Sequence, residues 1–383
     1  MKKKIIIIGG GLTGILISKF LDKKKFDVTL VESGKNLGGY LSSVKHGNHS
    51  FDFGTHFLRE TGNKSIDKLL FKKLKPEWNK FKIIPSGCYY NKKLIKSNQF
   101  IDIRRHKEYK KIFKEILTKK KIKFDFHNEL ERCLYDFGKI ITHKIIKPII
   151  LKYCNVKLKN IKPHTIDKFA LGRYVIASNQ KTLRLKNENE FNDKVIAHNS
   201  FKNGVTGLYN FYPKTGGIEK FVNLFLDKKI RLIKGKKISK IKIYKKKINT
   251  IIFENKKLNA DFVFSTVPLN KIIGRKISEK FDKHNKFIDW AVANIISDKK
   301  FKTSCYYVNI HDPETNAYRI TFYDNIQNTK NKKEYRATIE LVGYKNKKIS
   351  KDKIYNLLEK TKLIDKRHKI DLLSFFKTKL PFS

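Results

Sequence analysis

The chain has 383 residues, of which 86 are Lys or Arg and 35 are Asp or Glu, giving a formal net charge of +51 at pH 7. This length exceeds what one hydrophobic core usually supports, so we expect two domains, and a hydrophobic content of 40% is enough to fill them. Apolar runs fall short of the roughly 18 to 20 residues that a membrane-spanning helix needs, so we expect no membrane span.

The positive charge is made almost entirely of lysine, since only 11 of the 86 basic residues are Arg. Lysine runs at residues 23–25, 119–121 and 245–247 stand at the ends of predicted elements and are not interleaved with aromatic residues. Lys, Ile and Asn, all abundant here, have A/T-rich codons, so a biased genome explains much of the excess. An anionic partner such as nucleic acid, a membrane surface or a phosphorylated substrate is the alternative interpretation. We predict a solvated lysine surface that binds nucleic acid at most without sequence preference and in a salt-sensitive manner.

The four cysteines are Cys88, Cys133, Cys154 and Cys305. They lie far apart in the sequence and form no C-x-x-C pair, which predicts neither a metal site nor a disulfide framework. Free thiols fit a reducing compartment, so we expect a cytoplasmic protein.

The first 20 residues, MKKKIIIIGGGLTGILISKF, allow two interpretations. Lysines before an apolar run are typical of a secretory signal, whereas a β-branched run that enters a glycine turn is typical of a dinucleotide-binding fold. Glycines interrupt the apolar run, and the chain continues with an amphipathic segment and a second strand where a signal would have a cleavage site. The dinucleotide-binding interpretation is therefore favoured.

This interpretation predicts a cofactor site at the turn between a buried strand at residues 5–8 and a helix at residues 13–21. The glycines follow the pattern G-x-G-x-x-G, which provides a tight turn, close approach of backbone N–H groups to a pyrophosphate, and close packing of the helix on the strand. The next strand ends on Glu32, 18 residues after the last of these glycines, where a carboxylate accepts hydrogen bonds from an adenosine ribose. The predicted cofactor contacts here are Gly9, Gly11, Leu12, Thr13, Gly14 and Glu32.

Further along the chain, the paired glycines Gly38 and Gly39 follow Glu32 closely and permit a second close approach to a cofactor. The stretch FDFGTHFL places His56 in a turn after a short strand, and FKIIPSGCYYNKKLI predicts a pair of strands. Residues 107 to about 160 have apolar residues at spacings of three and four, which predicts helices. The strand and glycine pattern returns at YPKTGGIEKFVNLF and is followed by several β-rich stretches.

We therefore predict an α/β protein with two interleaved domains. A Rossmann-like domain consists of residues 1–85 and 205–270. A second, largely helical plus β substrate domain consists of residues 86–204 and 271–330. The remaining segment, residues 331–383, is predicted to return toward the first domain.

Several of these stretches resemble a known family. IIIIGGGLTG and VTLVESGKNLGG are similar to the N-terminal fingerprint of the FAD-dependent amine oxidase and protoporphyrinogen oxidase-like superfamily, and YPKTGGIEKFVNLF and ADFVFSTVP resemble its returning helix and strands. FDFGTHFL, DFGKIITHKIIKPIILKYC and AYRITFYDN are most similar to the UDP-galactopyranose mutase-like branch, which is often associated with surface polysaccharide synthesis. The resemblance covers most of the chain.

The resemblance implies FAD as the cofactor, with its isoalloxazine ring near Gly38, Gly39 and the adjoining Tyr40. His56 matches a histidine that lies beside the flavin in the mutases. Arg319 matches an arginine that holds the diphosphate of the sugar nucleotide, a role that suits the forked guanidinium group. A structural salt bridge is the alternative role for Arg319, as a turn histidine bonded to backbone is for His56. Many relatives have Arg where this chain has Tyr40, so the chain departs from the family pattern at one phosphate contact.

Relatives also continue beyond KTKLPFS into a glycine-containing segment that holds the flavin pyrimidine, so we expect weaker FAD binding by this C-terminally truncated chain. The implied activity is isomerisation of a nucleotide-linked sugar, with a small molecule as substrate. An oxidoreductase of the amine oxidase type, which transfers hydride from substrate to flavin, is the second hypothesis. A catalytically idle, lysine-rich binding protein is the third.

Overall fold

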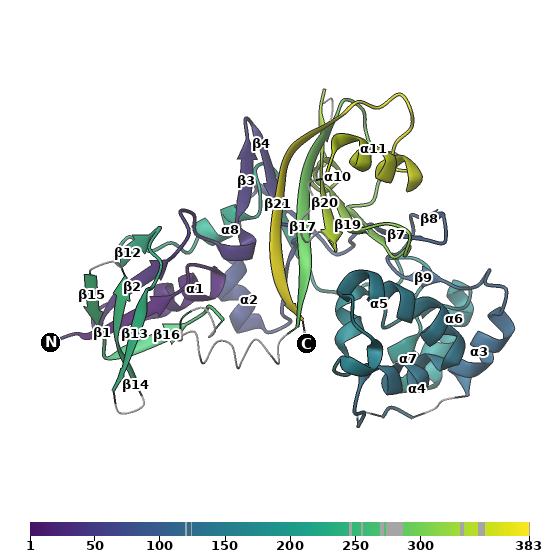
Figure 1. Ribbon diagram of the computed structural model, residues 1–383, viewed down its shortest axis with the longest axis horizontal. Coiled ribbons are helices and arrows are strands. Elements are labelled where there is room, and N and C mark those ends of the chain that lie inside the picture. Colours follow the sequence, from purple (N-terminus) through teal and green to yellow (C-terminus); the bar gives the residue numbers. More distant parts are fainter. Residues whose placement is uncertain are drawn as a thin grey trace. The chain divides into compact units, whose positions relative to one another are not determined.

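The computed structural model describes residues 1–118, 121–123, 125–244, 247–253, 256–268, 272, 286–329, 333–343 and 349–382. The chain divides into two compact units, each made of two separate stretches (Figure 1). Unit 1 contains Met1–His56 and Thr215–Lys286, and unit 2 contains Phe57–Lys214 and Phe287–Ser383.

Unit 1 is built on a parallel sheet of four strands in the order β12-β2-β1-β16. These strands are β1 (Lys3–Ile8), β2 (Phe26–Glu32), β12 (Arg231–Lys234) and β16 (Phe262–Ser265). The run of four isoleucines in β1 is buried, as expected for a strand that has neighbours on both sides. The sheet therefore joins the N-terminal residues to strands more than 200 positions later in the sequence.

Two layers cover this sheet. Helix α1 (Leu12–Phe20) follows the glycine turn and lies against the face that carries Ile7, since Ile7 closely approaches Gly14 of the helix. On the opposite face, Ile6, Ile8 and Val31 share a hydrophobic core with Ile251. The latter residue belongs to a second sheet of order β13-β14-β15, made of β13 (Lys240–Tyr244), β14 (Lys247–Phe253) and β15 (Lys256–Asn259). The remaining elements of unit 1 are β3 (Ser43–His46), β4 (His49–Asp52) and α8 (Glu219–Asn223).

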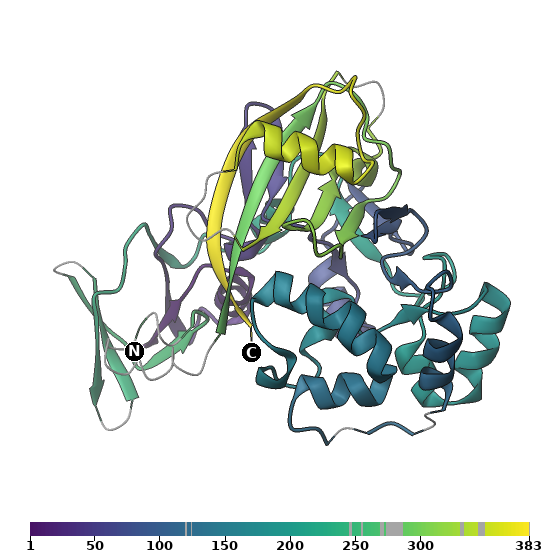
Figure 2. The ribbon, with the colours of Figure 1, turned by 45° about the vertical axis from the view of Figure 1, so that its right-hand side comes forward.

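Unit 2 contains a sheet of seven strands in the order β21-β17-β20-β19-β18-β7-β8, with helix α11 (Lys351–Lys360) across one face (Figure 2). Ile354 and Leu358 of this helix belong to the hydrophobic core that it shares with the sheet. The strands are β7 (Ser86–Tyr90), β8 (Lys93–Ile95), β17 (Lys286–Ser297), β18 (Tyr307–Ile310), β19 (Ala317–Phe322), β20 (Tyr335–Val342) and β21 (Ile370–Phe382). The predicted strand pair is confirmed as the antiparallel pair β7 and β8.

A group of helices forms the rest of unit 2, and the predicted helical middle of the chain is confirmed (Figure 1). Their core includes Phe137 and Ile149 and continues to Trp290 and Tyr318 of the large sheet. The helices are α3 (Tyr109–Leu117), α4 (Glu129–Ile141), α5 (Lys147–Cys154), α6 (Asn179–Glu188) and α7 (Glu190–Val195). The smaller elements are β5 (Leu58–Arg59), α2 (Lys64–Phe71), β6 (Trp78–Phe81), β9 (Ile101–Asp102), β10 (Tyr174–Val175), β11 (Asn210–Pro213) and α10 (Tyr323–Gln327).

The unit boundaries differ from the predicted domain boundaries. Residues 57–85 and 205–214 belong to unit 2 because β11 pairs with both β5 and β6 in a three-stranded sheet. The described parts of residues 331–383 form β20, α11 and β21 within unit 2. The predicted boundary between 270 and 271 lies outside the described residues.

Candidate functional site

The glycine turn of unit 1 contains three glycines with different surroundings. A Cβ atom on Gly14 would lie 2.0 Å from the carbonyl oxygen of Gly9, and one on Gly9 would lie 2.4 Å from the Thr266 hydroxyl. A Cβ atom on Gly11 would meet nothing within 4 Å. Gly14 therefore allows helix α1 to pack closely on the strand and turn, and Gly9 allows the turn to pack closely on Thr266, which follows β16. Gly11 leaves open space where helix α1 begins.

The beginning of α1 offers hydrogen-bond donors to this open space. Gly11 is the N-cap residue and provides no side-chain cap, and the following backbone N–H groups belong to the first turn, which has no partners within a helix. Leu12 is half-buried and Thr13 is exposed. N–H groups without a partner within the helix and the positive end of the helix dipole together favour an anion such as a pyrophosphate.

Glu32 and the second pair of glycines lie beside this turn. The Glu32 carboxylate accepts hydrogen bonds from the backbone N–H groups of Gly10, at 2.7 Å, and Gly34, at 2.6 Å. Gly38 donates to the Gly10 carbonyl at 2.8 Å, and a Cβ atom on Gly39 would lie 3.3 Å from the Cα atom of Gly11. The structure thus brings the two glycine turns and the acidic residue together in one place.

Two other residues of the predicted cofactor site are near the edges of this region. Tyr40, in a short 3-10 turn at Gly39–Leu41, is 58% exposed, so its ring is available to a ligand. His56 is half-buried and is the last residue of the first stretch of unit 1.

Unit 2 contains a cavity of about 480 Å³ with a strongly cationic lining. Five of its lining residues are basic and one, Asp167, is acidic. All of them belong to unit 2, and they come from the helices, from the segment before β10 and from the large sheet. The basic ones are Arg132, Lys168, Arg173, Lys194 and Arg319.

Arg319 of β19 is held by the neighbouring strand β20. Its Nε and Nη2 atoms donate to the two carboxylate oxygens of Glu340 at 2.7 and 3.1 Å. The Glu340 side chain is only 3% exposed, and Arg319 also lies 5.1 Å from the ring centroid of Tyr318. Burial raises the pKa of Tyr318 to about 12, so its hydroxyl stays protonated near neutral pH. The Nε and Nη2 atoms of the Arg319 guanidinium are therefore occupied by Glu340, and the third nitrogen, Nη1, is left for a ligand.

Arg173 and Lys168 are cavity residues that sequence reasoning missed. In the part of the chain that the structure describes, neither has a carboxylate within ion-pair distance. Arg173 also lines a second cavity, of about 340 Å³, together with Gln99 and Phe100, so it stands where the two cavities meet. Arg173 follows Gly172 directly, but nothing in that short stretch distinguishes it from the many other basic residues of the chain.

Comparison with known proteins bears on both sites. Residues 7–73 match the family described as an NAD(P)-binding Rossmann-like domain. Reduced UDP-galactopyranose mutase is similar over 99% of this chain and 82% of its own, with 16% identity and a TM-score of 0.72. A putative protoporphyrinogen oxidase from Exiguobacterium sp. 255-15 is similar over 100% and 88%, with 13% identity and a TM-score of 0.67. A triple mutant of putrescine oxidase is similar over 98% and 84%, with 10% identity and a TM-score of 0.58.

The chain shares the fold of these three proteins. The predicted fold class is confirmed, and the predicted resemblance agrees with these similarities in fold. One curated relative, carotenoid phi-ring synthase from Chlorobaculum tepidum, is 42% identical over 60 residues, which are 13% of this chain and 9% of that protein. The open glycine turn of unit 1 lies within residues 7–73, the stretch that matches the NAD(P)-binding Rossmann-like domain.

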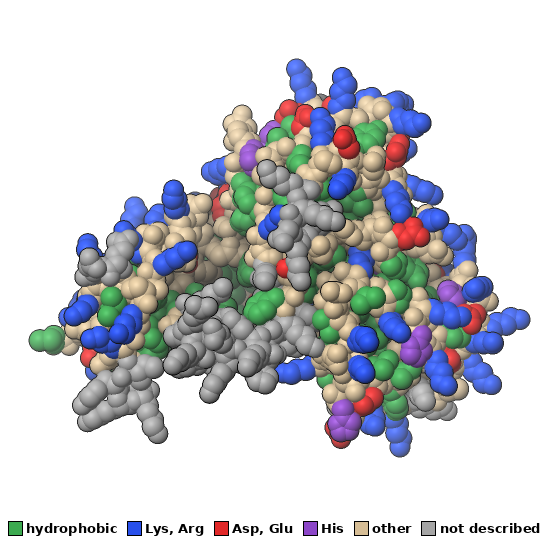
Figure 3. Space-filling model, viewed as in Figure 1, with side chains coloured by type: hydrophobic (Ala, Val, Ile, Leu, Met, Phe, Trp, Pro, Cys, Tyr) green, Lys and Arg blue, Asp and Glu red, His purple; other side chains and the backbone are tan. Residues whose placement is uncertain are grey.

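The described part of the chain also bears on metal clusters, disulfides and membrane-spanning helices. Among those residues, no group of three or more His, Cys, Asp or Glu side chains could hold a metal ion, and all four cysteines are buried free thiols. No helix there combines the length and the apolar character needed to cross a membrane. On the face shown in Figure 3, Lys and Arg side chains are spread over the surface and do not gather into one patch.

Proposed function

We propose that this protein is an FAD-dependent enzyme that acts on a nucleotide-linked sugar. The observation that carries the proposal is the cationic cavity of unit 2, which contains a half-buried arginine without an ion pair, in a chain that also has an open glycine turn for a dinucleotide. The similarity in fold to UDP-galactopyranose mutase supports the same substrate class.

The residues of unit 1 fit FAD. The space beside Gly11 and the N–H groups at the start of α1 suit a pyrophosphate, and the Glu32 carboxylate has acceptor capacity left for a ribose in addition to its two backbone donors. Gly38, Gly39 and Tyr40 would adjoin the isoalloxazine ring, and His56 would lie beside it. When bound, FAD supplies electron-transfer and nucleophilic reactivity that the side chains of this chain do not offer.

The cavity of unit 2 fits a diphosphate with attached groups. Its volume of about 480 Å³ is within the usual range for small-molecule sites. Arg173 would contact one phosphate through its free guanidinium, and Arg319 would contact the other through Nη1 while Glu340 holds it in place. These two contacts would bind and orient the substrate.

The second candidate is an oxidoreductase that transfers hydride from its substrate to the flavin. The fold similarity to putrescine oxidase supports this class of reaction. A cationic amine is a poor fit to a cavity lined by five basic residues and one acid, because like charges in a partly enclosed site repel. A hydride-transfer substrate would therefore be anionic or neutral.

Two measurements test the proposal. The visible absorption spectrum of the purified protein, with added FAD and then dithionite, shows whether a flavin binds and is reduced. Calorimetric titration with UDP, UDP-galactose and UDP-glucose then measures occupation of the cavity. We expect Arg173→Ala to weaken binding of UDP about ten- to a hundredfold through loss of a charge-assisted contact.

Arg184→Ala is the matched control for this substitution. Arg184 is 84% exposed, pairs only loosely with Glu188 at 3.6 Å, and does not line the cavity. We expect it to bind UDP like the wild type. Absence of flavin binding would overturn the cofactor assignment, and equal loss of UDP affinity in both variants would show that the effect is general charge and not a site.

A further inference from the structure

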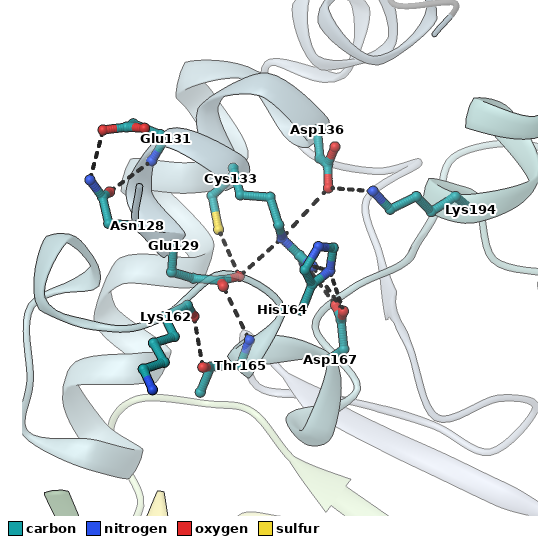
Figure 4. Close-up of polar contacts among 11 residues, drawn as sticks. Asn128, Glu129, Glu131, Cys133, Asp136, Lys162, His164, Thr165, Asp167 and Lys194 are labelled. Carbon is teal, nitrogen blue, oxygen red and sulfur yellow. Dashed lines mark hydrogen bonds and ion pairs between the residues drawn. The ribbon is translucent and has the colours of Figure 1, made fainter. Parts of the chain in front are cut away.

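A buried arginine on helix α4 links three elements that line the cationic cavity. The Arg132 side chain is 1% exposed, and its two terminal nitrogens donate to both carboxylate oxygens of Asp167 at 2.8 Å each. Its Nε atom lies 3.2 Å from a Glu129 oxygen and 3.6 Å from an Asp136 oxygen. Asp136 in turn pairs with Lys194 of α7 at 3.5 Å. Figure 4 shows Glu129 and Asp136, both of α4, and Asp167, of a later segment, converging on one place.

Helix α4 holds the segment Thr165–Arg173 at two points. Besides the pairing with Asp167, the second oxygen of Glu129 accepts a hydrogen bond from the backbone N–H of Thr165 at 3.1 Å. Both contacts lie at the beginning of the segment, which leads directly to Arg173. Burial acts to raise the pKa of Asp167, but the hydrogen bonds and charge of Arg132 outweigh it and hold that pKa below its ordinary value, so the pair stays ionised near neutral pH.

The backbone of this segment depends on such contacts for its shape. His164 and Ala170 flank its first turn with φ angles of 67° and 57°, a left-handed conformation that residues with a side chain rarely adopt. Gly172 packs so closely on the Asp167 carboxylate that a Cβ atom there would lie 2.3 Å from an oxygen. Because local preferences oppose this path, tertiary contacts must impose it.

The same segment provides much of the cavity wall. Asp167, Lys168, Ala170, Gly172 and Arg173 all line the cavity. The two cations among them that lack an ion pair in the described chain are therefore carried by the segment that Arg132 holds.

We propose that Arg132 is a positioning residue, which acts through Asp167 to fix the segment Thr165–Arg173 so that Arg173 faces the phosphates of the substrate. This inference rests on the proposed function of the cavity. It assigns to the Arg132–Asp167 pair an effect on affinity that is distinct from its effect on stability.

The substitution Asp167→Asn separates positioning from simple charge. It keeps the size of the side chain and removes one negative charge from the cavity lining. Electrostatics alone would make the cavity bind anions more tightly. Loss of the Arg132–Asp167 ion pair predicts the opposite, namely affinities for UDP and for inorganic pyrophosphate that are about tenfold lower. This loss corresponds to one weakened charge-assisted hydrogen bond.

Two further readouts distinguish this role from a structural one. In a double-mutant cycle, Asp167→Asn and Arg173→Ala should be clearly non-additive, because both act on the same contact. Hydrogen exchange of the amides of residues 165–173 should become faster in Asp167→Asn at a temperature where the protein is fully folded. Glu131→Gln is the control, since Glu131 lies on α4 and bonds Asn128 and His127 away from the cavity.

The outcomes are distinct. The inference alone would be overturned if the wild type binds UDP, Arg173→Ala weakens that binding, and Asp167→Asn leaves it unchanged or makes it tighter. Failure of the wild-type chain to bind UDP and pyrophosphate would overturn the proposed function and this inference with it. Weaker binding, non-additivity and local loss of exchange protection would support Arg132 as a positioning residue that acts through Asp167.

Discussion

The two candidate sites of this protein are built by opposite means. In unit 1 the site consists mainly of backbone N–H groups and of space left by glycines, with Glu32 as its main charged group. In unit 2 the site consists of long charged side chains that reach a cavity from several elements, and carboxylates hold two of them, Arg132 and Arg319, in place. Adding atoms should therefore destroy the first site, whereas removing atoms or charges should destroy the second.

The largest effect should come from Gly14→Ala. The new Cβ atom would lie 2.0 Å from the backbone carbonyl oxygen of Gly9, so helix α1 would have to move away from the sheet. We expect a loss of about 4 kcal/mol in the free energy of unfolding, although Ala normally stabilises a helix interior relative to Gly. Urea unfolding measures this. The same substitution at Gly11, where the Cβ atom meets open space, is the control and should cost about 1 kcal/mol or less.

Removing the charge of Arg319 should destabilise unit 2 almost as much. Arg319→Met removes the bidentate ion pair that Arg319 forms with the buried carboxylate of Glu340, which we expect to cost about 3 to 4 kcal/mol. The double variant Arg319→Met with Glu340→Gln should regain most of this stability while UDP binding stays weak. Thermal unfolding of both variants measures the stability, and calorimetric titration of both variants measures the affinity for UDP. A double variant as unstable as the single one would show that packing, and not the lost ion pair, determines the loss.

The buried carboxylate of Glu129 should make stability depend on pH. Burial raises its pKa to about 7 from 4.5, despite the opposing charge of Arg132. Between these values the folded chain holds a proton that the unfolded chain has lost, so stability should fall as the pH rises from about 4.5 to 7, by on the order of 3 kcal/mol. Glu129→Gln should flatten the dependence measured by denaturant unfolding at pH 5 and pH 7. Glu131→Gln on the outer side of the same helix should preserve it.

The smallest effect on free energy is expected for Gly11→Val, and it should fall on the ligand and hardly on the fold. Gly11 has a φ of −72°, which any residue can adopt, but the Val side chain would fill the space proposed for the pyrophosphate. We expect FAD affinity to fall by about a hundredfold, or about 2.7 kcal/mol. Flavin fluorescence titration measures this. Normal affinity in this variant would show that the dinucleotide lies elsewhere.

The difference between the units also explains what could be predicted from the sequence. The glycine turn, Glu32 and Gly38 lie within about 30 residues of one another, and each has a local geometric reason for its identity. Arg319 was found only through the resemblance, and its partner Glu340 depends on the register of β19 and β20, which shifts at an irregularity next to Arg319. That register follows from tertiary packing, so the sequence contains no direct signal for it.

The sequence contained part of the information needed to predict the charged cluster around Arg132 on α4. Glu129, Arg132 and Asp136 are spaced by three and four residues, which places their side chains on one face of a helix. In the sequence this stretch predicted only a packed helix, because Asp167 and Arg173 come from a segment more than 30 residues later. The boundary near residue 57 was missed for the same kind of reason, since β11 decides the placement of β5 and β6.

The parallel pairing of β7 with β18 has a consequence for the order of folding. It joins Ser86 to Tyr307, and the parallel sheet of unit 1 likewise joins Ile5 to Phe262. Closing such long loops costs conformational entropy before any strand contact is gained, which slows the formation of both sheets. The contacts within α3–α7, residues 109–195, are more local. We therefore expect the helices to form first during refolding, as a scaffold on which the large sheet of unit 2 then assembles.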